Sequence, residues 1–176
     1  MLILQKNDPR LRVTSLEVKP DEIKLKKIKK IIADMKSALA SQEDGVAIAA
    51  PQLGVPLRIF VVSGKVFAML KDAADSKQKE PDRVFINPKI TRISKKKGTV
   101  EEGCLSVRNI YGKIKRADKV RIQAYGEDGN FFERGGSGLL SQIFQHETDH
   151  LNGILFTDTA TDLAHYDPNN HKVKNK

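Results

Sequence analysis

Two histidines, a glutamate and a single cysteine are the residues of this 176-residue chain whose types could do chemistry. His146 and His150 enclose Glu147 in an HExxH pattern. On a helix, positions i and i+4 lie one above the other, so the two imidazoles can bind one metal ion. Glu147, next to the first imidazole, can then act as a general base toward a water molecule that the metal activates. The spacing therefore predicts metal-assisted hydrolysis.

The HExxH pattern leaves the third protein ligand of the metal open. Phe156 occupies the position where a further histidine would extend the pattern, and no glutamate follows Glu147. Cys104 is a candidate because Gly103 beside it lets the backbone approach closely, and two histidines with one thiolate leave a coordination position free for hydrolysis. A lone cysteine is also common as a small buried hydrophobe. The alternative ligands are three aspartates near the C-terminal end: Asp158, Asp162 and Asp167.

A buried helix must position the two histidines. The stripe that contains them continues back through Ile143 and Leu139, and further apolar residues cover the neighbouring face of residues 138–152. Gly153 follows, at a position where helices commonly end. A buried helix with two imidazoles, a glutamate and an aspartate needs compensation for their desolvation, which metal coordination supplies. We therefore expect residues 138–152 to form a buried metal-binding helix.

The other elements are one more helix and a group of strands. Apolar residues at spacings of three and four predict an amphipathic helix over residues 21–40, with lysines on its other face. Strands are predicted in mid-chain, at residues 58–62, 84–93, 120–125 and 130–133, and the last two form a β-hairpin with a four-residue turn. Asn87 and Pro88 indicate that residues 84–93 form an edge strand or a bent one. We expect an α+β fold in which mixed or antiparallel strands pack around the C-terminal metal-binding helix, with an N-terminal amphipathic helix.

The chain length predicts one domain, at roughly 100–200 residues per domain. We place a single catalytic metallohydrolase domain at residues 1–164 and a poorly ordered basic tail at residues 165–176. Residues 71–82 are polar and predict an exposed loop or insertion. The single cysteine excludes an intrachain disulfide framework and fits a reducing compartment.

Targeting signals and the net charge limit the possible locations and partners of the chain. The first residues lack the basic region and apolar stretch of a secretory signal, and no apolar run approaches the ~20 residues of a membrane span. We expect a cytoplasmic protein without a membrane partner. Lysine and arginine number 31 against 22 acidic residues, which gives a net charge of +9. This excess favours encounters with RNA, but aromatic stacking platforms are missing from the basic runs, so we expect at most a weak ribosome association and no DNA partner.

Three segments taken together resemble the signature motifs of the peptide deformylase family. They are residues 45–52, 102–106 and 145–153, in the family's order and at comparable separations. Residues 8–12 also resemble the family's N-terminal segment, so the resemblance covers almost the whole chain. The reaction that it implies is hydrolysis of the N-formyl group from the formylmethionine at the start of nascent polypeptides, with release of formate.

The resemblance also implies a metal site. Its ligands would be Cys104, His146 and His150, which would hold one divalent metal ion per chain. The family's metal in the cell is ferrous iron, which is sensitive to oxygen and is often replaced by zinc, nickel or cobalt on purification.

Catalytic and substrate-binding roles follow from the same resemblance. Glu147 would take a proton from water and deliver it to the departing amine, while the Gln52 side-chain amide and the Leu105 backbone N–H would donate to the developing oxyanion. The substrate backbone would lie along two residues as an added strand, in a cleft where a glycine leaves room beside the metal. An apolar pocket would take the methionine side chain. The residues assigned to substrate binding are Val46, Ala47, Gly103, Leu139 and Ile143.

Two departures from the family pattern concern the cleft. The first motif usually reads Gly-x-Gly, and here Ala47 replaces the second glycine. If that position had a positive φ, alanine would cost about 1 kcal/mol; otherwise its methyl group only narrows the cleft. Many members have a proline after the second motif, where this chain has Arg108 and Asn109, which indicates a variant loop over the cleft.

Two other functions fit part of the pattern. A zinc endopeptidase would use the same HExxH helix on internal peptide bonds. A non-enzymatic basic module would bind ribosomal RNA and keep a structural metal. Glu147 and Gln52 argue against the second alternative, because a structural metal site needs neither residue.

Overall fold

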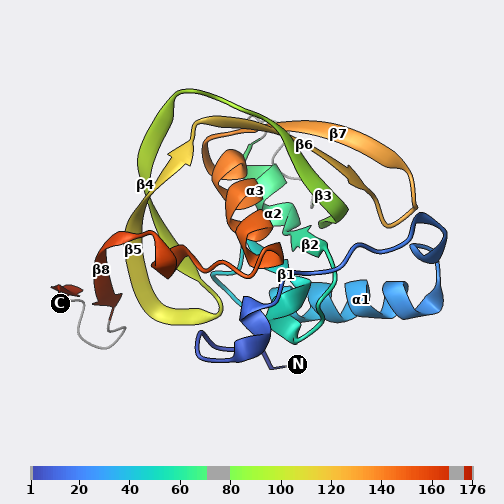
Figure 1. Ribbon diagram of the computed structural model, residues 1–176, viewed down its shortest axis with the longest axis horizontal. Coiled ribbons are helices and arrows are strands. Elements are labelled where there is room, and N and C mark those ends of the chain that lie inside the picture. Colours follow the sequence, from blue (N-terminus) through green and yellow to red (C-terminus); the bar gives the residue numbers. More distant parts are fainter. Residues whose placement is uncertain (1, 71–79, 167–172, 176) are drawn as a thin grey trace.

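Two antiparallel sheets and a helix between them make up the structure, a computed structural model that describes residues 2–70, 80–166 and 173–175 (Figure 1). The first sheet has the order β1–β2–β3–β6–β7 and consists of β1 (Ala47–Ala49), β2 (Ile59–Val62), β3 (Arg83–Ile93), β6 (Lys119–Tyr125) and β7 (Phe131–Ser137). The second has the order β4–β5–β8–β9 and consists of β4 (Lys97–Cys104), β5 (Val107–Ala117), β8 (Thr161–Tyr166) and β9 (Val173–Asn175). Helix α3 (Gly138–Leu151) contacts strands of both sheets. The expected α+β fold around a C-terminal helix is confirmed.

Helix α1 (Lys26–Ala40) is the predicted amphipathic helix, but it begins later than residue 21. Pro20 opens a separate 3-10 turn, and Leu25 is extended with a ψ of 148°, which interrupts helical hydrogen bonding between the two segments. Ile23, which is fully buried, anchors the turn in the core. The remaining helical segments are α2 (Gly64–Met69) and 3-10 turns at Pro9–Arg12, Pro20–Glu22, Ala50–Leu53 and Phe156–Asp158.

Strand β3 is bent and does not lie at a sheet edge, because it pairs with β2 along its first half and with β6 along its second. Asn87 has a φ of 51°, and the pairing register shifts between Ile86 and Lys89. Proline lacks the N–H that a ladder needs, so a bend at Pro88 is its physical consequence. The Asn87 side chain stabilises the bend by hydrogen bonds with both backbone groups of Val18, at 2.7 and 2.8 Å.

The C-terminal end of α3 is fixed by a glycine, as predicted. Gly153 has a φ of 73°, and a Cβ atom there would lie 2.5 Å from the Arg12 carbonyl oxygen. Only glycine fits both conditions. On the other side of the helix, Phe144 packs in the aromatic core with Phe60 and Phe85, and this packing holds α3 against the first sheet.

The predicted hairpin and tail can be placed as far as the structure describes them. Strands β6 and β7 pair from Lys119↔Ser137 to Tyr125↔Phe131 around the turn at residues 126–129, which confirms the hairpin. Strand β8 continues across the predicted domain boundary at residue 164 and pairs with β5 and β9. Residues 167–172 and 176 of the predicted tail, and residues 71–79 of the predicted insertion, lie outside the described residues. In the described ranges, no helix has the length and apolar character needed to cross a membrane.

Candidate metal centre

Helix α3 and strand β4 bring three metal-ligating side chains together. His146 and His150 are one turn apart on α3, with ring centroids 4.9 Å from each other. Cys104, the last residue of β4, places its Sγ atom 3.2 Å from His150 Nε2. One ligand atom from each of the three residues lies within 4.8 Å of the others. In the parts of the chain that the structure describes, no second group of three histidine, cysteine or acidic side chains has this geometry.

The aspartates that were alternative third ligands lie elsewhere. Asp158 forms an ion pair with Arg12 at 2.5 Å and accepts a hydrogen bond from the Leu155 backbone N–H. Asp162 is exposed and pairs with Lys113 at 3.0 Å. Asp167 is outside the described residues. Cys104 is therefore the candidate that the fold brings to the two histidines.

The donor set fits a transition metal ion. Burial alone would raise the pKa of the Cys104 thiol, but the electrostatic interaction with His150 and the hydrogen bonds from both imidazoles hold that pKa well below its usual range. The thiolate is the form that binds metals. His150 directs Nε2 toward Cys104 while its Nδ1 is buried without a partner among the described residues. A thiolate with two imidazoles suits zinc, iron, cobalt or nickel rather than magnesium or calcium.

A buried ion network, which was not predicted from the sequence, orients the first histidine. Glu102 Oε2 lies 2.9 Å from His146 Nδ1, which leaves His146 Nε2 for the metal. The same carboxylate accepts two hydrogen bonds from Arg116, at 2.8 and 2.9 Å, and Arg116 also pairs with Asp149 at 2.6 Å. A sequence signal existed, because Glu102 is an ionisable residue only two positions before the candidate ligand Cys104. The partners Arg116 and Asp149 come from other elements and carry no local signal.

The network makes a testable prediction. Burial alone would raise the pKa of Glu102, but hydrogen bonds from His146 and Arg116 outweigh it and lower the pKa from 4.5 to about 2. Glu102→Gln leaves Arg116, which is only 9% exposed, without its main partner. We expect it to destabilise the fold by roughly 3–5 kcal/mol in urea unfolding and to weaken metal binding by roughly 10–100-fold in chelator competition.

The sign of the pH dependence follows from the lowered pKa. The carboxylate stabilises the folded state above the unfolded-state pKa of 4.5, and this contribution is lost as the pH falls toward about 2. The stability difference between wild type and Glu102→Gln should therefore shrink across that interval. Glu133→Gln, which breaks an exposed pair with Arg121, is the control and should leave the urea midpoint nearly unchanged. Equal urea midpoints and equal metal affinity for wild type and Glu102→Gln would contradict the role given to this network.

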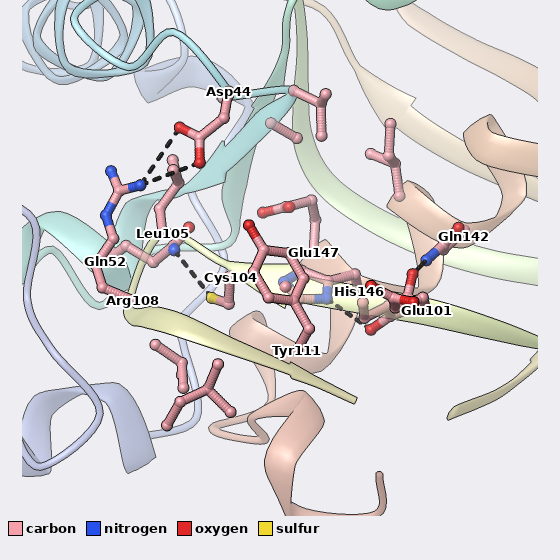
Figure 2. A pocket seen from close by; sticks show the side chains of 18 of the residues that line it. Asp44, Gln52, Glu101, Cys104, Leu105, Arg108, Tyr111, Gln142, His146 and Glu147 are labelled. Atoms are coloured by element: carbon pink, nitrogen blue, oxygen red, sulfur yellow. Dashed lines mark hydrogen bonds and ion pairs between the residues drawn. The ribbon is translucent and has the colours of Figure 1, made fainter. Parts of the chain in front are cut away.

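Glu147 and Gln52 lie beside the three ligands. Glu147 is 4% exposed, and its Oε2 has no hydrogen-bond partner within the described ranges. Burial raises the pKa of the Glu147 carboxyl to about 7. Gln52 is 1% exposed; its Oε1 accepts from the Ala49 backbone N–H at 2.8 Å, and its Nε2 points toward Cys104 Sγ at 3.7 Å (Figure 2). Gln52 Nε2 also donates to Ser106 Oγ at 3.1 Å, a buried contact that was not predicted from the sequence.

A cavity of about 270 Å³ opens onto these groups. All five residues expected to bind substrate line it: Val46, Ala47, Gly103, Leu139 and Ile143. Leu105, which follows the cysteine ligand, also lines the cavity. Ile143 is buried, while Leu139 is 40% exposed at the cavity wall. The cavity therefore joins an apolar wall from α3 to the polar groups around Cys104.

The two departures from the family pattern also lie at this cavity. Ala47 belongs to strand β1, and the described non-glycine residues with positive φ are Asn87, Asn109 and Asp162. Ala47 therefore has no strain from a positive φ. The only effect left for its methyl group is to narrow the cleft. Asn109 has a φ of 60°, a conformation that asparagine tolerates better than most residues. Arg108 and Asn109 line the cavity, but they belong to strand β5 (Val107–Ala117), so the prediction of a variant loop is wrong.

A Cys–His–His site with a buried glutamate, set on a central helix between antiparallel sheets, defines a metal-dependent hydrolase. The family model described as polypeptide deformylase matches residues 1–165. The chain therefore belongs to the polypeptide deformylase family, the metal-dependent hydrolases that remove the N-formyl group from nascent polypeptides.

Individual relatives agree with this assignment. A peptide deformylase from Psychrobacter arcticus is 40% identical over 161 residues, which are 92% of this chain and 79% of the relative. The crystal structure of a peptide deformylase from Legionella pneumophila superposes with a TM-score of 0.75 at 37% identity, over 90% of this chain and 85% of that one. The crystal structure of a class I type b peptide deformylase from Acinetobacter baumannii with Met-Ala-Ser bound has a TM-score of 0.78 at 28% identity, over 90% of this chain and 97% of that one.

Proposed function

We propose that this chain hydrolyses the N-formyl amide of formylmethionine on nascent polypeptides, with Glu147 moving the proton and Gln52 and Leu105 stabilising the oxyanion. The observation that carries this proposal is the position of Glu147. Its carboxyl group is buried next to the three ligands at the cavity, yet its Oε2 has no partner among the described residues. An unpaired buried carboxyl group destabilises the fold, so a catalytic use is its best explanation.

The metal site is proposed to hold one divalent ion per chain through Cys104, His146 and His150. When bound, such an ion lowers the pKa of water toward ~7 and polarises a carbonyl group. Ferrous iron is the proposed ion in the cell, with zinc, nickel or cobalt as replacements in purified protein. The mixed sulfur and nitrogen donor set supports all four.

Glu147 acts as the proton carrier of the reaction. Its carboxylate accepts a proton from the attacking water molecule and gives it to the nitrogen of the departing amine. Burial raises the pKa of this carboxyl group, and a raised pKa favours uptake of the proton from water.

Gln52 and Leu105 are the proposed donors to the oxyanion. The hydrogen bond between Gln52 Oε1 and the Ala49 N–H fixes the orientation of the side-chain amide, so Nε2 must face the cavity side where Cys104 lies. The Leu105 backbone N–H immediately follows the cysteine ligand in the chain. Donors that are fixed before the reaction need no reorganisation when charge develops on the formyl oxygen.

Replacing Gln52 tests this assignment. We expect Gln52→Leu to lower kcat by roughly 10²–10³-fold with a much smaller change in KM. Because the change also leaves the buried Ala49 N–H without its acceptor, a stability loss of about 1–3 kcal/mol should accompany it. Gln52→Glu keeps an acceptor for Ala49 but removes the donor, so its kcat should fall at least as far. A wild-type kcat in both variants would assign Gln52 to holding the loop alone.

The substrate is proposed to add to the open edge of β1. This strand pairs only with β2 among the described residues, and its other edge faces the cavity through Val46 and Ala47. Backbone pairing of this kind accepts many sequences. The wall formed by Leu139 and Ile143 would take the unbranched methionine side chain, and Gly103 would leave room for the backbone. The Met-Ala-Ser peptide bound to the Acinetobacter baumannii relative, whose sequence matches a deformylated product, supports this use of the cavity.

Formate release separates this function from its alternatives. With formyl-Met-Ala-Ser, the metal-loaded protein should release formate and a free amine, and kcat/KM should exceed that for acetyl-Met-Ala-Ser by more than about 10-fold, because the space proposed beside the metal would fit the formyl hydrogen and not the acetyl methyl group. A zinc endopeptidase would instead cleave an internally blocked peptide. An RNA-binding module would do neither. Equal kcat/KM for the formyl and acetyl peptides would contradict the proposal.

The place of action is proposed to be the cytoplasm, on chains that emerge from the ribosome. The net charge of +9 supports a weak association with ribosomal RNA. Such an association would be electrostatic, so it should weaken steeply with salt. Co-sedimentation of the protein with ribosomes at low salt, lost at high salt, would support it, while no co-sedimentation at low salt would contradict it.

A further inference from the structure

We propose that Arg108 and Asp44 form a charge-reading subsite for the substrate residues that follow the methionine, in which Arg108 favours acidic side chains and Asp44 favours basic ones. The inference rests on the proposed function. The two side chains line the cavity outside the metal centre. Arg108 stands where many family members have proline.

The pair lies at one end of the cavity (Figure 2). Arg108, the second residue of β5, reaches Asp44 in the segment between α1 and β1, with its Nη1 3.2 and 3.3 Å from the two carboxylate oxygens. In Figure 2 the two side chains face each other at one end of the cavity, opposite Glu101 and Gln142. Arg108 and Asp44 both line the cavity, with side chains 37% and 61% exposed. Both charges are therefore accessible to a substrate.

The guanidinium is held in place from a second side. Arg108 Nη2 donates to Gln42 Oε1, and Gln42 Nε2 in turn donates to Ser41 Oγ at 2.7 Å. The amide orientation of Gln42 is thus set, with its oxygen toward the arginine. A charge that is fixed before binding loses little side-chain entropy on contact with a ligand. Arg108 is therefore positioned as a recognition group and not as a freely moving surface side chain.

The site geometry directs the substrate toward this pair. The formyl end must lie near Gln52 and Cys104, and Gln52 comes just after the C-terminal end of β1. A peptide along the open edge of β1 must therefore leave toward the N-terminal end of the strand. Asp44 lies three residues before Ala47, the first residue of β1. At about 3.3 Å per residue, a peptide whose first residue lies beside Ala47 places its second and third residues beside Val46 and Gly45, within side-chain reach of the Asp44–Arg108 pair.

The two charges act on the substrate in opposite directions. In the wild type they partly cancel, so both acidic and basic side chains are accepted. Without Arg108, Asp44 remains uncompensated and repels acidic side chains. Without the Asp44 charge, Arg108 is free to pair with a substrate carboxylate, an interaction to which its planar group is well suited.

The test is the ratio of kcat/KM for acidic over basic peptides. Formyl-Met-Ala-Asp and formyl-Met-Ala-Lys, both as C-terminal amides, probe the third residue, and formyl-Met-Asp-Ala and formyl-Met-Lys-Ala probe the second. We expect Arg108→Ala to lower the ratio by about 3–20-fold and Asp44→Asn to raise it by a similar factor, because each variant changes an exposed charge interaction with the acidic peptide and with the basic one. The effect should be larger at the third residue than at the second. High salt should reduce these differences.

Controls separate charge reading from a structural role. Arg121→Ala removes a positive charge from an exposed pair with Glu133 on strands β6 and β7, so it changes the net charge by the same amount as Arg108→Ala. Its ratio of kcat/KM for acidic over basic peptides should equal that of wild type. A purely structural clasp would change kcat/KM for all four peptides alike and leave the ratio constant. A constant ratio at both positions in both Arg108→Ala and Asp44→Asn overturns the inference while formate release still supports the proposed function. No formate release by the metal-loaded wild type from any formyl peptide would overturn both.

Discussion

Glu147→Ala is expected to keep the metal ion and to lower kcat by about 10²–10⁴-fold, the usual contribution of a general acid–base group. Glu147 follows the ligand His146 in the chain, but its carboxyl group does not belong to the three metal-ligating side chains whose ligand atoms lie within 4.8 Å of one another. Removing it should therefore leave the donor set intact. Metal content by elemental analysis and kcat from formate release are the two measurements.

The same variant should not be less stable than wild type. Its buried carboxyl group has an oxygen without a partner in the described structure, and burial raises its pKa to about 7, so the folded state gains little from it. Functional residues often carry such a stability cost. Glu147→Gln, which keeps the shape but cannot accept a proton, is the matched control and should be nearly as slow as alanine. Loss of the metal in Glu147→Ala would place Glu147 in the coordination shell, and an unchanged kcat would remove it from the mechanism.

Cys104→Ala is expected to have the second large effect, loss of tight metal binding together with activity. Removing a residue that only hydrogen-bonds to a metal ligand already lowers metal affinity by roughly 10–100-fold. Removing the thiolate ligand itself should therefore lower metal affinity by more than about 100-fold. At equal total metal, formate release should fall in proportion to the bound ion. Chelator competition and elemental analysis after gel filtration measure the affinity and the stoichiometry.

The control for this variant comes from the chain itself. Asp158→Asn and Asp162→Asn change the described aspartates that were alternative ligands, and because each pairs with a basic residue away from the site, both variants should keep metal and activity. If Cys104→Ala retained one ion per chain and the wild-type rate, the thiolate would not be a ligand.

The metal-binding helix could be predicted because its signals are local. The i, i+4 spacing of the two histidines, the apolar stripe through Ile143 and the glycine at position 153 all lie within one element. The start of α1 could not be placed, because the extended backbone at Leu25 depends on packing of the preceding turn that no periodicity indicates.

The polar surroundings of the site were harder to predict because they join distant elements. Arg116 on β5 reaches Glu102 on β4 and Asp149 on α3, and each contact depends on the register of the sheet and its distance from the helix. The cysteine ligand was one of several candidates until the family resemblance singled it out, since residue types alone did not exclude the aspartates. Arg108 was visible as a departure from the family pattern, but its partner Asp44 lies 64 positions away and appears only in the fold.

The dependence of formate release on a bound metal ion can be tested by metal titration of the metal-free protein. Ferrous iron added without oxygen, or zinc in a parallel series, should raise the rate of formate release from formyl-Met-Ala-Ser linearly until one ion per chain is bound, after which the rate should stay constant. Formate release at the loaded rate by the metal-free chain, or no release from a chain that has bound one ion, would contradict the account.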